Sequence, residues 1–518
     1  MPIQSNIAKK KNVFQTYFIY VAVAFIVSLG FFLRLYNIQE WMVWNDDVGI
    51  ELLIATHAIK YNELTSIAPV SGTPFAYYTP TYSTLITFLW KFLPSPTLLI
   101  YAFCLWGSIG IFFAYLTGKY ARNSLCGCIF ALLVATSGTL INDSNQILRN
   151  SINQPLLLML GFLLSYWAKN KRVSILFLII QLSFLSLHFY TSFLPIGLLL
   201  ILLTTYVIQK TYKQPYVTLT AIGVTVLNVG LYYALAYTSH SGSLISFFHN
   251  NISLVDYWSR LIKNVSYTLT LAFPLFPVSI GVIIGFELCF YAGLKILIDP
   301  KKYSPLLIAY VFYIVSMVGI SFIAQDLMIY RLVIFTPIVY FCISYSITVF
   351  PKQIQYILYF LLLYYVIFLQ NNFYKFISEP TNTYHDQTVV IDVILQDSQK
   401  FSFMNKQASY HLFYMQNVPE FIQSSSTLWY LAEQSTRKRL INIIKTPPYF
   451  KPIIVESPTF DYLVCEASEA IHNQFEICKN KFINFYGLSI QRDTLVTLIP
   501  KNKTGQKYRI YRWNHGTK

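Results

Sequence analysis

Long apolar segments recur along the first 371 residues, separated by short polar connections. Most of them are about 17 residues or longer, which is the length that a helix needs to cross the hydrocarbon core of a membrane. About twelve can be counted, at approximately 13–36, 79–94, 97–118, 123–141, 153–168, 173–189, 192–208, 216–238, 266–293, 303–324, 330–349 and 355–371. The pattern predicts an α-helical polytopic membrane domain over residues 1–371, with about 11–13 transmembrane helices.

Basic residues stand at alternate junctions between the apolar segments, and these charges orient the chain. The clusters are Lys119 and Arg122; Lys169, Lys171 and Arg172; Lys210 and Lys213; Lys295, Lys301 and Lys302; and Lys352. The positive-inside rule places these junctions, and the N-terminus with its lysines at 9–11, in the cytoplasm. The first apolar run is too long for a cleaved signal core, so we expect an uncleaved first span. Expected on the outer face of the cytoplasmic (inner) membrane are 142–152, 239–265, 325–329 and everything after 371.

The number of segments conflicts with this orientation. Twelve crossings from a cytoplasmic N-terminus would return the C-terminus to the cytoplasm. Two explanations stay open at this point. Segment 79–94 is short and bounded by prolines, so it could fail to cross, or segment 266–293, interrupted by Pro274 and Pro277, could contain two passes.

Two regions are predicted outside the membrane. In the outer loop at 37–78, apolar residues recur at helical spacing at Val48, Leu52, Ala55 and Ile59, which predicts an amphipathic interfacial helix. Residues 372–518 are predicted to form a soluble extracytoplasmic α/β domain. Its expected strands include 388–391, 452–455, 494–498 and 508–511, and its expected helices lie near 403–416, 427–444 and 466–481.

Composition excludes some functions. Charged residues make up 12% of the chain, against roughly 25% in soluble proteins. The net charge of +16 comes from clusters between apolar segments, so we expect no nucleic-acid partner. The seven cysteines have no metal-ligand spacing, and those in apolar segments are expected to be small buried hydrophobes. A disulfide between Cys465 and Cys478 is left open.

An acidic pair, Asp46 and Asp47, follows the first apolar segment. One explanation is an N-cap for the interfacial helix, although capping alone accounts for one of the acids. The other explanation is a chemical role, because a carboxylate in a partly dehydrated pocket can act as a general base or hold a divalent cation. The residues by themselves do not decide between these explanations, and they leave a metal requirement unknown.

The arrangement of four stretches is similar to that of the GT-C glycosyltransferases, polytopic enzymes that use polyprenyl-phosphate sugars. "WNDDVGIELLIATHAI" (44–59) resembles the acidic-pair and helix stretch of that family, and "YYTPTYSTLITFLWKFLP" (77–94) resembles the segment that follows. Residues 118–172 resemble the next helix pair, with Arg149 in the outer loop between them, and "MIYRLVIFTPIVYF" (328–341) resembles a late arginine-tyrosine-proline segment. The resemblance covers about 13–371 and is nearest to protein mannosyltransferases and lipid A aminoarabinose transferases.

The resemblance implies an integral-membrane glycosyltransferase that moves a hexose or pentose from a polyprenyl-phosphate carrier to a protein, lipid or cell-envelope glycan on the outer face. Asp46 takes the position of the catalytic Asp, with Asp47 beside it. The residues expected to contact substrate are Arg331, Arg149, His188, Tyr330 and Tyr82. Ordinary alternatives are a snorkelling arginine, an interfacial hydrogen-bonded histidine and an aromatic belt.

Two departures from the family pattern limit what can be carried over. Asp47 stands where many relatives have Glu, and Tyr78-Thr79-Pro80 replaces a Lys-Pro-Pro. A donor-phosphate role for that lysine is therefore not transferable.

The alternative function is a polytopic transporter or lipid-carrier flippase without glycosyl transfer. Such proteins usually show inverted repeats and charges near the membrane midplane. The sequence has no evident internal symmetry, and its acidic pair lies at the membrane interface. Asp143 and Asp326 are expected at solvated helix ends.

Overall fold

The computed structural model describes residues 2–36, 80–189, 194–212, 215–238, 256–272, 293–299, 303–322, 329–377, 412–415, 462–467, 490–497 and 507–513, with ten single positions between 38 and 62. The chain divides into two compact units. Unit 1 comprises Met1–Tyr36, Ser71–Tyr82 and Ser95–Phe373; unit 2 comprises Asn37–Val70, Ser83–Pro94 and Tyr374–Lys518.

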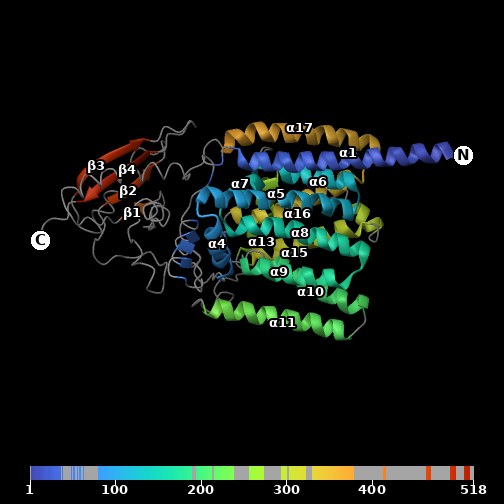
Figure 1. The fold of residues 1–518 in the computed structure, drawn as a ribbon, viewed down its shortest axis with the longest axis horizontal. Helices are drawn as coiled ribbons and strands as arrows, with labels where there is room; N and C mark the ends of the chain where they lie inside the picture. Colours follow the sequence, from blue (N-terminus) through green and yellow to red (C-terminus); the bar gives the residue numbers. More distant parts are fainter. Residues whose placement is uncertain are drawn as a thin grey trace. The chain divides into compact units, whose positions relative to one another are not determined.

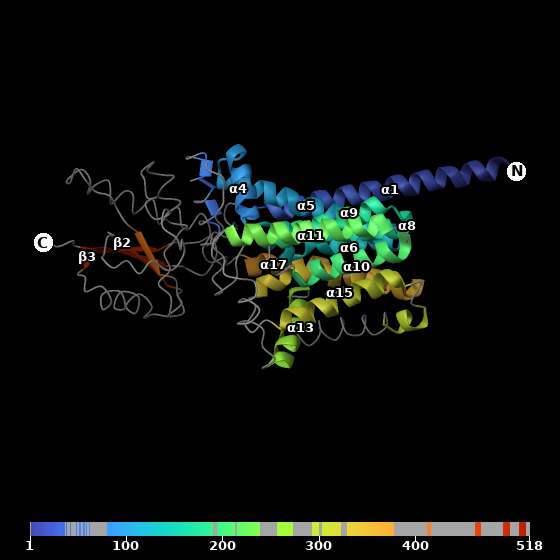
Figure 2. The same ribbon diagram turned by 90° about the horizontal axis from the view of Figure 1, so that it is seen from below.

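Unit 1 is a bundle of helices that run roughly along one direction (Figures 1 and 2). Its elements are α1 (Pro2–Leu35), α5 (Pro96–Ala121), α6 (Ser124–Thr136), α7 (Gly138–Ser144), α8 (Arg149–Asn170), α9 (Val173–Phe189), α10 (Leu194–Tyr212), α11 (Pro215–Thr238), α13 (Tyr257–Ala272), α15 (Ser304–Ser321), the 3-10 helix η2 (Ile329–Phe335), α16 (Thr336–Ile347) and most of α17 (Lys352–Ile377). Helix α5 packs against α1, α6 and α8, and α9 packs against α8 and α10. Because consecutive helices are neighbours, the core forms from antiparallel pairs.

Three described stretches are long and apolar enough to cross a membrane: Tyr17–Leu35, Pro96–Ala121 and Ser304–Ser321. Helices α6 and α7 meet the same criterion together, although they are bent by 62° at the break between them. Shorter apolar helices include Val173–Phe189 and Leu332–Ile347. The chain is therefore mostly helical with several apolar helices, as the hydrophobic pattern predicted.

Helix α4 (Thr81–Phe92) has 12 residues, so it is about 18 Å long at 1.5 Å per residue. The hydrocarbon core of a bilayer is about 30 Å thick. Helix α4 is thus too short to cross by itself, which favours the first explanation of the segment-count conflict. Of the second candidate, segment 266–293, residues 273–292 lie outside the described residues.

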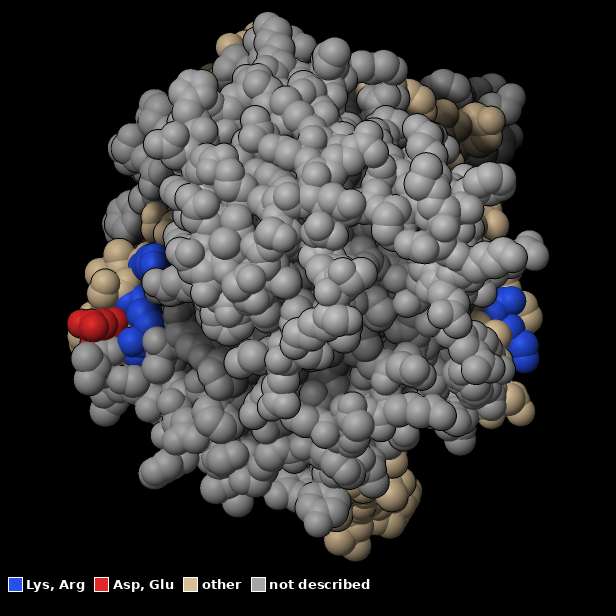
Figure 3. Space-filling model, turned by 90° about the vertical axis from the view of Figure 1, so that its left-hand side faces the viewer, with Lys and Arg blue, Asp and Glu red and all other residues tan. Residues whose placement is uncertain are grey.

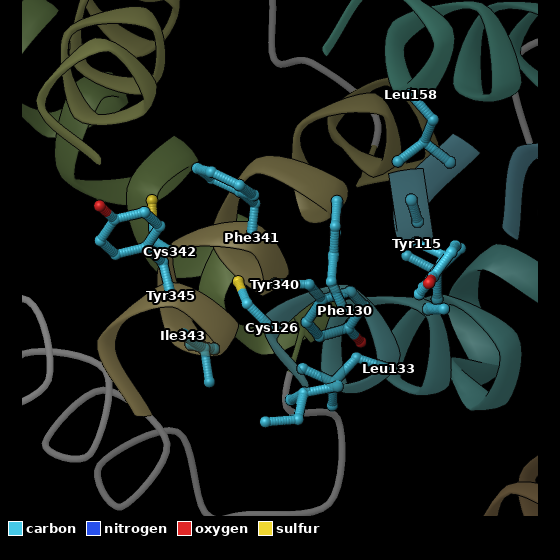
Figure 4. Close-up of a cluster of buried hydrophobic side chains, with 14 of the residues drawn as sticks. Tyr115, Cys126, Phe130, Leu133, Leu158, Tyr340, Phe341, Cys342, Ile343 and Tyr345 are labelled. Carbon is cyan, nitrogen blue, oxygen red and sulfur yellow. The ribbon is translucent and has the colours of Figure 1, made fainter. Parts of the chain in front are cut away.

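A large apolar cluster holds α6 and α16 together with α1 and α5. Figure 4 shows Phe130 and Leu133 of α6 between Tyr115 on one side and Phe341 and Tyr345 on the other. The helices approach closely where α5 meets α6, because a Cβ on Gly127 would lie 2.4 Å from the Tyr115 carbonyl oxygen. A second cluster joins α8, α9 and α10 with α15 and η2.

The sequence-based boundaries need two corrections. Arg149 was expected in an outer loop, but it is the first residue of α8. Part of the expected loop 239–265 is helical, because α13 begins at Tyr257. In both cases polar residues occupy the first turn of a helix, and a hydropathy pattern reads such residues as loop.

Helix α17 continues to Ile377, and after it the described part of the chain is a four-stranded sheet. Its strands are β1 (Leu412–Met415), β2 (Tyr462–Ala467), β3 (Ile490–Thr497) and β4 (Lys507–Trp513), in the order β1-β2-β4-β3. Strand β1 pairs parallel with β2, and β4 pairs antiparallel with both β2 and β3. The strand predicted at 494–498 overlaps the second half of β3, and the one predicted at 508–511 lies within β4. The helix predicted at 403–416 is wrong over 412–415, where the chain pairs with β2 instead.

Candidate functional site

Ser137 separates α6 from α7 as the C-cap of one and the N-cap of the other, and this break leaves carbonyl groups at the end of α6 without helical partners. Arg34, in the last turn of α1, supplies donors to them. Its guanidinium donates to the carbonyls of Val134 and Ala135, each at 3.4 Å, and to its own-helix Gly30 carbonyl at 2.9 Å. The Arg34 side chain is fully buried. A buried arginine therefore compensates for a broken helix.

Helix α7 meets the same arginine. Arg34 Nε donates to Ser144 Oγ at 3.2 Å, and Asp143 interacts electrostatically with the guanidinium. Space for this contact depends on Gly107 of α5, because a Cβ there would lie 2.5 Å from Ser144 Oγ and 3.1 Å from Arg34 Nε. The short α7 helix is thus held against α1 by side chains that a larger residue at 107 would displace.

Asp143 is 6% exposed, so the expectation of a solvated helix end is wrong. Its backbone carbonyl accepts a hydrogen bond from Ser151 Oγ of α8. Its Oδ2 atom is buried and has no hydrogen-bond partner among the described residues. A buried carboxylate oxygen of this kind requires a compensating charge or ligand, and Arg34 supplies the charge.

The first two turns of α8 carry a run of buried polar side chains: Arg149, Asn150, Ser151, Asn153 and Gln154. Asn153 Nδ2 donates to the Ser186 carbonyl of α9 at 3.2 Å. Asn153 Oδ1 and both amide atoms of Gln154 are buried without a hydrogen-bond partner in the described part of the chain. In the interior of a membrane protein such groups are expensive and commonly serve function.

The first turn of α4 closes this region. The Arg149 guanidinium carbon lies 4.8 Å from the centroid of the Tyr82 ring, which is cation–π geometry. The preceding residue, Thr81, has its Oγ1 atom 3.5 Å from Nδ1 of His188 in the last turn of α9. Tyr82 and His188 are both buried. Tyr82 is therefore a packed partner of Arg149 rather than a lipid-facing belt residue.

These contacts connect the last turn of α1, the end of α7, the first turns of α8 and α4, and the last turn of α9. We call this region the polar end of unit 1. Three of the five residues predicted to contact substrate, Arg149, His188 and Tyr82, lie within it. All three came from separate stretches of sequence, and the fold brings them to one end of the bundle.

The other two predicted residues, Tyr330 and Arg331, belong to η2. This 3-10 helix packs against α7, α8, α13 and α16. Leu332, Val333 and Phe335 anchor it in the core, while the side chains of Tyr330 and Arg331 lie outside the described residues. The backbone of η2 is thus a neighbour of the helices that carry Asp143 and Arg149.

The acidic pair Asp46 and Asp47 also lies outside the described residues. In the helix predicted after it, the described positions are helical, and Val48, Leu52 and Ala55 are fully buried as the amphipathic pattern predicted. Ile59, by contrast, is 39% exposed, and Ala58 is buried in its place.

Within unit 2, the helix that follows the acidic pair contacts α4. The carboxylate of Glu51 is buried, and its Oε2 atom accepts a hydrogen bond from Ser83 Oγ at 2.6 Å. A hydrogen bond to a charged group is stronger than one between neutral groups. It therefore fixes the helix that follows Asp47 to the third residue of α4.

No three His, Cys, Asp or Glu residues of the described chain are grouped as metal ligands. On the face drawn in Figure 3, the described basic side chains lie toward opposite edges, and acidic ones appear beside one of these groups. Of the cysteines predicted to be buried hydrophobes, Cys104, Cys126 and Cys342 are buried. Cys478 lies outside the described residues, so its pairing with Cys465 stays open.

Sequence reasoning missed Arg34, Asn153 and Gln154. A signal for Arg34 was present, because it is a charge at the end of the first apolar segment, where charges are usually functional. The signal for the two amides was their place in "RNSINQP", a polar run directly before a long apolar segment.

Known structures share this architecture. ArnT from Cupriavidus metallidurans, solved bound to undecaprenyl phosphate, aligns with a TM-score of 0.57 at 10% identity, covering 94% of this chain and 97% of that one. The Archaeoglobus fulgidus oligosaccharyltransferase in its apo form aligns with a TM-score of 0.50 at 11% identity, covering 81% of this chain; the chain spans 64% of that protein. No protein family model and no curated protein sequence matches the chain. The chain therefore shares its fold with these two proteins.

Proposed function

We propose that this protein is an integral-membrane glycosyltransferase that takes a sugar from a polyprenyl-phosphate carrier on the outer face of the cytoplasmic membrane. The acceptor is a protein, a lipid or a cell-envelope glycan. The observation that carries the proposal is the alignment with ArnT over nearly the full length of both chains. That structure holds undecaprenyl phosphate, a lipid of the class that this proposal requires.

The polar end of unit 1 supports the proposal with suitable chemistry. A polyprenyl-phosphate sugar presents an anionic phosphate and several hydroxyl groups beside an apolar chain. Arg149 can offer a planar fork of donors to phosphate oxygens, and its position over Tyr82 holds it at the start of α8. The buried amides of Asn153 and Gln154 match sugar hydroxyl groups as donors and acceptors.

The reaction assigns roles to the predicted residues. Asp46 accepts the proton of the acceptor hydroxyl or amine as that atom attacks the anomeric carbon. Asp47 supports Asp46 or holds a divalent cation. Arg331 stabilises the charge that develops on the departing phosphate, with Arg149 as the second candidate. His188 and Tyr330 complete the proposed substrate contacts.

Incubation of membranes containing the protein with an isotope-labelled polyprenyl-phosphate sugar tests the function. The expected result is label covalently attached to a protein, lipid or glycan product, together with release of the polyprenyl phosphate. A flippase or transporter would instead move intact labelled lipid across the membrane without forming any product. That second outcome would overturn the proposal.

A further inference from the structure

The opposite end of unit 1 is cationic, and contacts between helices define it. Lys169 of α8 lies 5.3 Å from the ring centroid of Tyr120 of α5, which places the ends of these two helices together. Tyr212, the last residue of α10, joins them, because its hydroxyl donates to the Lys171 carbonyl. The end of α16 lies here too, since the Arg122 guanidinium is 5.9 Å from the centroid of the Tyr345 ring.

Among the described residues, these cations contact aromatic rings and not carboxylates. Lys119 lies 5.6 Å from the ring centroids of both Tyr20 and Tyr115, and Lys171 lies 4.2 Å from that of Trp167. Residues 64–255 contain a single acidic residue, Asp143, and it belongs to the polar end. Within the described part of the chain, the cations are therefore positioned by ring faces, which do not neutralise their charge.

The turn between α5 and α6 concentrates this positive charge. Lys119 and Arg122 lie before it, and the N-terminus of the 13-residue helix α6 follows. Arg122 Nε is buried and has no hydrogen-bond partner among the described residues. Asn123 caps the helix by accepting from the Cys126 N–H at 2.9 Å. A guanidinium fork beside a helix N-terminus is an arrangement that favours a phosphate group.

The surroundings of the turn suit a lipid better than a free ion. Tyr17, Tyr20, Val21 and Phe25 of α1 are all about half exposed or more, and Leu125 of α6 is 45% exposed. Tyr20 is also the residue whose ring contacts Lys119. Apolar side chains that could contact an acyl chain therefore lie next to the cations. Lys119 contacts the ring of Tyr115, and Arg122 contacts the ring of Tyr345. Figure 4 shows these two rings on opposite sides of α6.

We propose that the turn between α5 and α6 is a binding site for the phosphodiester headgroup of an anionic phospholipid, with Arg122 and Lys119 as its ligands and the exposed face of α1 as the acyl-chain contact. The positive-inside rule places this end of unit 1 in the cytoplasmic leaflet, where anionic lipids are attracted to basic residues. The site lies at the other end of the bundle from the proposed transferase site and does not depend on that function.

The test uses the full-length protein in an uncharged detergent, mixed with equal amounts of phosphatidylglycerol and phosphatidylcholine. Lipids retained after gel filtration are counted by mass spectrometry. The native protein is expected to retain phosphatidylglycerol preferentially, and Arg122→Gln is expected to lower that preference about five-fold. An Arg122→Gln protein that elutes as a folded species and keeps the full preference would overturn the proposal.

Matched controls separate a site from general surface charge. Lys210→Gln removes a cation that lies over Tyr206 at the same end, and Lys263→Gln removes one that lies over Tyr267 of α13. Both are expected to leave the preference nearly unchanged, and an equal loss in Lys210→Gln would contradict a local site. If Arg122→Gln does not fold, Arg122→Lys keeps the charge without the fork and is expected to lose part of the preference. Displacement of the lipid by inorganic phosphate would assign the turn to a free anion instead.

Discussion

The guanidinium of Arg149 lies over the ring of Tyr82, with 4.8 Å between the guanidinium carbon and the ring centroid. This pair joins the first residue of α8 to the first turn of α4, and both side chains are buried. Its neighbour contact, between Thr81 and His188, joins the same turn of α4 to α9. The start of α4 is therefore positioned by two contacts with residues that the sequence assigned to substrate binding.

Replacing Tyr82 with Leu is expected to destabilise the protein by about 2 kcal/mol, because the desolvated cation–π contact with the buried Arg149 guanidinium is lost. Tyr82→Phe keeps the ring and is expected to change the free energy of unfolding much less. Thermal or denaturant unfolding in detergent measures both. Equal stability of the Leu and Phe variants would show that the ring face contributes nothing.

Replacing Arg34 with Met is expected to destabilise the protein by about 3–5 kcal/mol, because the carbonyls of Val134 and Ala135 and the carboxylate of Asp143 lose a buried cationic partner. Arg172→Met, which removes an exposed arginine, is the control and is expected to stay within about 0.5 kcal/mol of the native protein. Unfolding midpoints in detergent compare the two variants. A tolerated Arg34→Met would mean that the break between α6 and α7 is stabilised in another way.

Replacing Gly107 with Ala is expected to destabilise the protein by about 1–3 kcal/mol, because the new methyl group would overlap Ser144 Oγ and crowd Arg34. Gly223→Ala in α11 is the matched control, since a Cβ there meets nothing within 4 Å. It is expected to be neutral or stabilising by up to about 1 kcal/mol, as Ala favours helices. The opposite signs of these two substitutions can be read from the same unfolding assay.

The hydropathy pattern predicted the helices well where they are uniformly apolar, as for α5, α9 and α15. It did not predict the break at Ser137, because segment 123–141 contains no proline and reads as one span. The break depends on partners that are distant in sequence. Arg34 binds the freed carbonyls, and the Tyr340 hydroxyl donates to Ser137 Oγ at 3.0 Å.

The candidate site could also be predicted only in part, again because the burial of its residues depends on partners that are distant in the sequence. Arg149, His188 and Tyr82 were selected from the sequence, and the fold brings them to one end of unit 1. Asp143 was assigned to solvent, since a polar residue between two apolar segments reads the same whether it is buried or exposed. Its burial follows from Arg34, which lies more than a hundred residues earlier and supplies the opposing charge.

Replacing Ser83 with Ala is expected to destabilise the protein by about 1–3 kcal/mol, because the buried carboxylate of Glu51 loses a donor. Glu51→Gln keeps an acceptor oxygen for Ser83 and is expected to have a smaller effect. The double variant completes a cycle, and its effect is expected to be smaller than the sum of the two single effects. Additive effects in the unfolding assay would mean that the two side chains are not coupled.

The most direct test of the proposed function is sugar transfer by an Asp46→Asn variant. The native protein and the variant are compared in membranes at equal protein level, with labelled polyprenyl-phosphate sugar as donor. Asp256→Asn serves as control, because Asp256 is an exposed acid in a left-handed backbone conformation that Asn also tolerates. The account predicts product with the native protein and the control, and a loss of about a hundred-fold or more with Asp46→Asn, as expected when a general base is removed. Full transfer by a correctly folded Asp46→Asn protein would contradict it.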